Sequence, residues 1–230
     1  MMDCSECVVR NRAICAGLNP DELAILSNMG HKKTLKAGDI LLWEGEASVI
    51  VANILNGVLK LSTNNENGDE QIVGILFESE FVGRPFGTKN PFTITAVTDT
   101  KLCVFGRSDF EQFSASHPDL QQKLLEQSLN GLDQTRHWLA MLGHKSASAK
   151  IATFLLVLSE RLAANNCKSE AFLDDFILPF DRQQIANILG LTIETTSRQL
   201  SRMRNDGVID LPTRRKVVIN DRYAMEALAG

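Results

Sequence analysis

The chain has 230 residues, of which 44% are hydrophobic and 23% are charged, and its formal net charge is −4. This composition excludes a disordered chain, a collagen-like repeat and a disulfide-dense scaffold. The longest apolar runs have about six residues, far short of the roughly 20 that span a bilayer. No secretory signal is recognisable, so the sequence predicts a cytoplasmic protein without a membrane partner.

Three of the five cysteines lie close together at the start of the chain, at Cys4, Cys7 and Cys15. Thiolates are the ligands of Fe–S clusters, which typically take four of them, and a C-x-x-C pair suits zinc equally well. Disulfides are not expected in a chain without an export signal. The spacing leaves an Fe–S cluster, a zinc site and unligated thiols open, with Cys103 and Cys167 as candidates for a fourth ligand.

Asn19 and Pro20 then mark the start of a helix, with Asn19 at the N-cap. Between residues 32 and 106, short apolar runs alternate with turns rich in Gly, Asn and Asp. The runs cover residues 40–43, 51–55, 57–61, 72–76, 92–97 and 102–105. Strands at such regular spacing predict an all-β barrel or roll.

A long helix is predicted over residues 119–142. Leu125, Leu132 and Leu139 repeat every seven residues, and Leu129 and Leu142 occupy the alternating position. This pattern fits a dimeric coiled coil and an intramolecular core helix equally well. Residues 143–146 are expected to end the helix, and a second helix is expected over residues 147–165.

Residues 178–218 carry the pattern of a winged helix-turn-helix. Asp181 is expected to begin a helix that ends at Gly190, and Thr192 to begin a second helix that runs to about Asn205. In such a motif the second helix lies in the DNA major groove. Two short apolar strands follow, and the basic residues 214–216 between them predict the wing.

The local charge and the residue types agree with DNA binding. Residues 181–230 carry eight basic and six acidic side chains, whereas the other 180 residues carry 16 basic and 22 acidic ones. Glu194, Ser197 and Arg198 share one helix face and can bond base edges, although an ordinary solvated face has the same pattern. The residues better suited to phosphates are Arg202, Arg204, Arg214 and Arg215.

From residue 18 to residue 230, the order of elements resembles the Crp/Fnr family of bacterial transcription regulators. The segments at 67–72, 82–86 and 192–198 look like those of its Fnr branch, in particular the FnrL/FnrN type. The resemblance implies an α+β fold with an N-terminal β-roll, a long dimerisation helix and a C-terminal winged helix-turn-helix. The corresponding domains would be a cluster-binding segment (1–17), the roll (18–118), the helix (119–143) and the DNA-binding domain (144–230).

The resemblance also implies a function, that of an oxygen-responsive activator that binds TTGAT-like palindromes as a homodimer and contacts RNA polymerase. It implies a [4Fe-4S] cluster whose ligands are Cys4, Cys7, Cys15 and Cys103, while Cys167 matches no ligand. Thr192 and Thr195 lie within the matching recognition helix and join the candidate DNA contacts.

Other functions are less well supported by the sequence. The acid and the arginine of a cyclic-nucleotide pocket are absent from the matching places in residues 82–96, so cAMP is not expected. The four histidines show no metal-ligand spacing and no nucleophile–base motif is present, so the chain is not expected to be an enzyme. The alternative is a regulator of the same architecture that senses a small ligand or thiol oxidation without a cluster.

Overall fold

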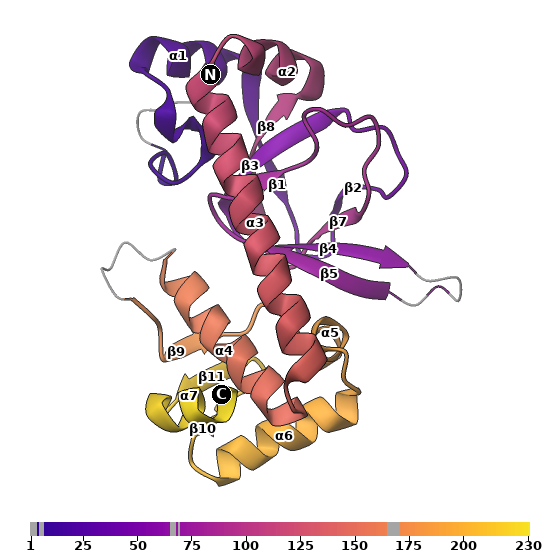
Figure 1. Cartoon of the computed structure of the whole chain (residues 1–230), viewed down its shortest axis with the longest axis vertical. Coiled ribbons are helices and arrows are strands. Elements are labelled where there is room, and N and C mark those ends of the chain that lie inside the picture. Colours follow the sequence, from indigo (N-terminus) through magenta and orange to yellow (C-terminus); the bar gives the residue numbers. More distant parts are fainter. Residues whose placement is uncertain (1–3, 5–6, 65–67, 69, 165–170) are drawn as a thin grey trace. The chain divides into compact units, whose positions relative to one another are not determined.

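The computed structural model describes residues 4, 7–64, 68, 70–164 and 171–230 (Figure 1). The chain forms two compact units, Met1–Gln134 and Thr135–Gly230. Helix α3 (Pro118–His144) runs through the division between them. The predicted domain boundaries at residues 17, 118 and 143 stay predictions, and Cys167 lies outside the described residues, as do Asn67 and Asp69 of the segment at 67–72.

The first unit begins with two short helices, η1 (Ile14–Gly17) and α1 (Pro20–Met29). Helix α1 starts where the sequence predicts. The Asn19 side chain accepts the Glu22 N–H at 3.0 Å, and the Glu22 carboxylate accepts the Asn19 N–H at 2.9 Å. This reciprocal pair satisfies two backbone donors that the helix leaves free.

Two four-stranded antiparallel sheets form a roll (Figure 1). The first sheet has the order β1-β8-β3-β6, and the second has the order β2-β7-β4-β5. The strands are β1 (Gly30–Leu35), β2 (Ile40–Leu42), β3 (Ile50–Asn56), β4 (Leu59–Asn64), β5 (Glu70–Leu76), β6 (Phe81–Val82), β7 (Thr93–Ala96) and β8 (Thr100–Gly106). All six predicted strands are confirmed.

Two apolar cores hold this unit together. One lies between the sheets and includes Ile54, Leu59 and Leu102. The other joins the outer face of the first sheet to the N-terminal residues, to α1, to α2 (Arg107–Ala115) and to the start of α3, and it includes Ile14 and Phe110. The N-terminal segment and α3 therefore share a core.

Cys103 lies within strand β8, inside the apolar run at 102–105 that predicts a strand. The strand is longer than this run, because Thr100 and Lys101 also pair with β1 and Gly106 pairs with β3.

Helix α3 presents a row of leucines that are exposed in the single chain. The exposed fractions are 59% for Leu125, 52% for Leu129, 45% for Leu132 and 65% for Leu139. These four do not belong to an intramolecular core, so that interpretation was wrong for them. The helix ends at His144, within the break expected at residues 143–146.

The second unit is a winged helix-turn-helix, as predicted. Its elements after α3 are α4 (Ala147–Ala163), β9 (Asp175–Ile177), α5 (Arg182–Leu189), α6 (Ile193–Asn205), β10 (Ile209–Asp210), β11 (Lys216–Ile219) and α7 (Arg222–Ala229). The three strands form an antiparallel sheet of order β10-β11-β9. Phe154 and Phe180 are fully buried, with ring centroids 6.0 Å apart.

Candidate thiol site and nucleic-acid interface

The four predicted cluster ligands gather on the outer face of the first sheet. Cys15 and Cys103 are buried members of the same apolar core, and Cys4 and Cys7 pack against that core half-buried. Three of these thiols come from the N-terminal segment and one from strand β8. The fold therefore joins residues that are far apart in the sequence.

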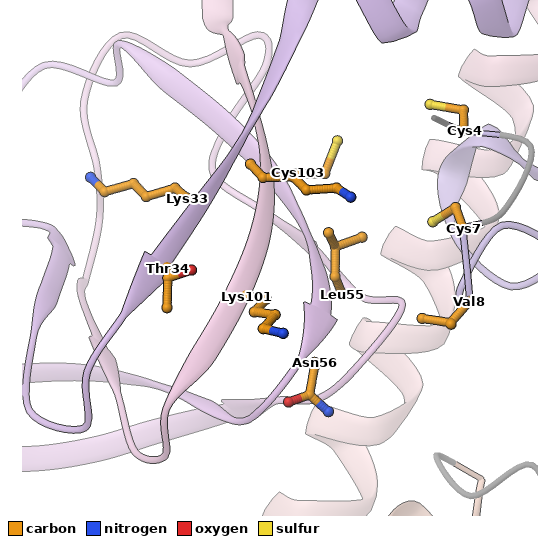
Figure 2. A pocket seen from close by; sticks show the side chains of 10 residues that line it. Cys4, Cys7, Val8, Lys33, Thr34, Leu55, Asn56, Lys101 and Cys103 are labelled. Atoms are coloured by element: carbon orange, nitrogen blue, oxygen red, sulfur yellow. The ribbon is translucent and has the colours of Figure 1, made fainter. Parts of the chain in front are cut away.

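A cavity of about 460 Å³ separates the N-terminal segment from the sheet and is lined by Cys4, Cys7 and Cys103. Figure 2 shows the sulfur atoms of Cys4 and Cys7 pointing toward the strand that carries Cys103, whose sulfur points back toward them. Among the described residues, no three Cys, His, Asp or Glu side chains stand close enough to hold a single metal ion. The thiols thus face a shared cavity, but they lie too far apart to bind one metal ion together.

Burial favours the neutral form of the two buried thiols. Burial raises the pKa of Cys15 to about 11, and the nearby Cys7 adds to the rise. Burial also raises the pKa of Cys103 well above its usual value, and the three other cysteines contribute. Because metals and clusters bind thiolates, ligation here must release protons.

Lysines surround the thiol cavity. Lys32, Lys33 and Lys101 line it together with the cysteines. Lys32 on β1 is the direct cross-strand partner of Cys103, and its charge opposes the rise in the pKa of that thiol. Because these lysines are positively charged, the site suits a group whose net charge is negative when four thiolates bind it. Lys32 and Lys33 gave no signal in the sequence because β1 was not predicted, and Lys101 lies on β8 just before the predicted run at 102–105.

The helix-turn-helix is defined at both of its helices by capping. The Asp181 carboxylate accepts the Gln184 N–H at 2.8 Å, which begins α5. Gly190 ends α5 with a φ of 60°, a left-handed conformation that glycine adopts without strain. Thr192 then begins α6, since its hydroxyl oxygen accepts the Thr195 N–H at 3.2 Å. Both predicted helices are confirmed.

Helix α6 has one buried and one exposed face. Thr196, Leu200 and Met203 are buried. The predicted base-reading residues Glu194, Ser197 and Arg198 are exposed, as is Arg202. The pKa of Glu194 is lowered by its own backbone N–H and by the Thr192 hydroxyl, so its carboxylate stays an acceptor. Such a face can meet base edges in a major groove.

The wing brings two further arginines to the surface. Arg214 and Arg215 are exposed between β10 and β11. The Thr213 hydroxyl shapes this turn by accepting the N–H groups of Arg215 at 3.3 Å and Lys216 at 2.9 Å. These positions fit contacts to phosphates, which orient a protein on DNA without reading its sequence.

Arg182, in the first turn of α5, was not among the predicted contacts. Its Nη1 is enclosed without a hydrogen-bond partner in the described chain, and burial lowers the pKa of the guanidinium. The only sequence signal was a basic residue in the first turn of the first helix. An unpaired cation at this place makes Arg182 a further candidate for a phosphate contact.

No helix in the described parts of the chain is both long enough and apolar enough to cross a membrane. Two family models match the sequence. Residues 32–117 match a cyclic nucleotide-binding domain, and residues 149–228 match a Crp-like helix-turn-helix domain.

Characterised relatives cover nearly the whole chain. The transcriptional activator protein FnrL of Cereibacter sphaeroides is 38% identical over 95% of this chain and 88% of its own length. The nitrogen fixation regulation protein FixK of Bradyrhizobium diazoefficiens is 32% identical over 98% of this chain and 93% of its own length. The structure of FixK2 from Bradyrhizobium japonicum shares the fold, with a TM-score of 0.77 at 23% identity over 87% of this chain and 98% of that one.

Proposed function

The chain belongs to the Crp/Fnr family of DNA-binding transcription regulators, and from this premise we propose that it responds to oxygen through a [4Fe-4S] cluster. The proposed ligands are Cys4, Cys7, Cys15 and Cys103. With the cluster in place, the homodimer binds palindromic TTGAT-like sites and contacts RNA polymerase through loops of the roll.

The gathering of the four thiols carries this proposal. Cys4, Cys7 and Cys103 line one cavity, and Cys15 is buried beside them. Four thiolates are the usual ligand set of a [4Fe-4S] cluster. A single zinc ion requires Zn–S distances of about 2.3 Å, which would draw the thiols much closer together. The wide spacing of the thiols and the lysines that line the cavity favour the [4Fe-4S] cluster, which is larger than a zinc ion and is anionic with its four thiolates.

The alternative in which the thiols themselves are oxidised has less support. Reactive cysteines are exposed and have lowered pKa values. Here burial raises the pKa values of Cys15 and Cys103, so both resist conversion to the reactive thiolate.

The charged residues that bind a cyclic nucleotide in other sensors of this architecture are missing from the matching places here. The exposed Arg84 stands where the resemblance requires an acid to bind the ribose. This difference supports a regulator that does not depend on cAMP.

The N-terminal segment is the means by which the thiols act on the dimer. A bound cluster would join the thiolates of Cys4, Cys7, Cys15 and Cys103 through iron, and its oxidation by oxygen would release them. While they are joined, the segment would be held against the sheet, where Ile14 and Leu18 share a core with Leu120 and Leu124 of α3. Release of the thiolates would loosen this core and change the position of α3 in the arrangement that pairs two copies. The exposed leucines of α3 provide the apolar face that pairing would cover.

Anaerobic purification tests the proposal. The protein should contain iron and sulfide near four of each per chain, as expected for this cluster type, with a thiolate-to-iron absorbance that disappears in air. Cys103→Ala should lose this absorbance and the anaerobic binding to a TTGAT palindrome.

The matched control is Cys167→Ser, which removes the one cysteine not proposed as a ligand and should keep both properties. Zinc in place of iron, or regulation that persists after all four proposed ligands are replaced, would contradict the proposal.

A further inference from the structure

Asn53 is a buried amide in the layer that holds the thiols. It is 2% exposed, and its Oδ1 has no hydrogen-bond partner in the described chain. Asn90, a second buried asparagine among the described residues of the roll, pairs its amide with a carbonyl. Leaving a buried polar atom unpaired destabilises the folded state, so an apolar side chain of similar shape would suit the apo core better.

The sheet places Asn53 directly beside Cys103. In the antiparallel pair of β3 and β8, these two residues face each other in register. Val51 and Leu55, two residues to either side of Asn53, pack in the same core as Cys103, which puts all of them on one face of the sheet. Directly opposed side chains have Cβ atoms about 4.5–5.5 Å apart, within reach of a hydrogen bond between an amide and a sulfur.

The two groups form a stronger pair when Cys103 is ligated, because a neutral thiol is only a weak donor and a weak acceptor. An ionised or metal-bound cysteine sulfur accepts hydrogen bonds, and an amide NH₂ donates two. A half-turn of the amide exchanges its oxygen and nitrogen, so either end can face the sulfur. Lys32, the neighbour of Cys103 on its other side, is exposed and supplies charge rather than a buried donor.

We propose that Asn53 is a positioning residue that donates an N–H bond to the Cys103 sulfur in the cluster-loaded protein and thereby slows loss of the cluster in air. This inference rests on the proposed cluster. Hydrogen bonds to cluster sulfurs favour the reduced, more negative form, so they raise the reduction potential.

The test compares wild-type protein with Asn53→Leu after anaerobic reconstitution. The leucine variant should bind one cluster per chain with a lower midpoint potential. The shift should match a threefold to tenfold change in the redox equilibrium, at most about 59 mV for a one-electron couple. Its absorbance should fall about threefold to tenfold faster in air-saturated buffer. The thermal midpoint of the apo protein should not fall, because an unpaired polar atom is removed.

Two further variants keep the result interpretable. Asn53→Asp preserves the shape but sets a second negative group beside the sulfur, so it should reduce iron content even if the leucine variant folds poorly. Asn90→Ala removes a buried asparagine at a distance from the cysteines, and it should leave the potential unchanged. Wild-type potential and decay rate in the loaded Asn53→Leu protein would overturn the role of Asn53 alone. Absence of a cluster from wild-type protein would overturn the proposed function and this inference together.

Discussion

Arg198 and Arg214 carry the same charge, but they occupy different parts of the DNA-binding unit. Arg198 is exposed on α6, and Arg214 is exposed in the wing. Arg198→Ala should weaken binding by about 1–3 kcal/mol at one base pair and relax the preference there. Arg214→Ala should weaken binding to all sequences alike and lower the slope of log K against log salt by about 1.

Titrations with a palindrome and its single-base variants, each at several salt concentrations, separate the two effects. Arg198→Lys serves as the control, because it keeps the charge but replaces the planar fork of donors by a flexible ammonium group. A uniform loss across sequences for Arg198→Ala would contradict a base-reading role.

Some residues of the sites follow from the sequence and others do not. Glu194, Ser197 and Arg198 were predictable because the helical period decides which residues share a face. Cys103 was only one of two candidates from the residues alone, and the resemblance selected it. Cys103 lies far from the N-terminal cysteines in the sequence. The fold of the sheet brings them together through long-range contacts, which no local sequence pattern predicts. Asn53 carried no signal at all, since its role depends on its cross-strand neighbour.

Two adjacent leucines of α3 show that one face of the helix packs in the core and another face is exposed. Leu124 is 8% exposed and belongs to the core shared with the N-terminal segment, whereas Leu125 is 59% exposed. Leu124→Ala should lower the free energy of unfolding by about 2–5 kcal/mol because it leaves a cavity. Leu125→Ala should leave the stability of the monomer almost unchanged and weaken dimerisation. Chemical denaturation and sedimentation equilibrium measure the two quantities, and a dimer unaffected by Leu125→Ala would argue against this interface.

Strand β1 shows why apolar runs do not predict every strand. The six predicted strands each have a side buried between the sheets, so their apolar residues are continuous or alternate. Four of the six residues of β1 are exposed, and its sequence contains His31, Lys32 and Lys33. The strand is held by pairing with β8 along its whole length rather than by an apolar face. The same exposure makes it the source of Lys32 and Lys33, two of the three lysines that line the thiol cavity.

For the whole molecule, the proposed function requires that ligation of the thiols change the affinity of the two copies for each other. Gln127 of α3 is placed to transmit it within the first unit. Its Nε2 donates to the carbonyls of Arg12, at 3.4 Å, and Ser79, at 3.1 Å. Ser79 has a φ of 69°, unusual for a residue other than glycine, and its N–H is bonded to Ile54 at 2.9 Å. One side chain therefore ties the cysteine-bearing segment and a constrained turn to α3.

Gln127→Ala should uncouple the cluster from dimerisation. Coupling between two sites typically changes an affinity about 5–150-fold. The dimer dissociation constant of wild-type protein should therefore be larger by such a factor without the cluster than with it. In Gln127→Ala this ratio should shrink about twofold to tenfold, because each hydrogen bond contributes about 0.5–1.5 kcal/mol, while the iron and sulfide content stays the same. Gln122→Ala is the control, since Gln122 lies on the same helix but donates to Glu126 at 3.2 Å. Anaerobic sedimentation equilibrium gives the constants. An unchanged ratio in Gln127→Ala would place the coupling in the apolar contacts of Ile14 and Leu18 with α3 instead.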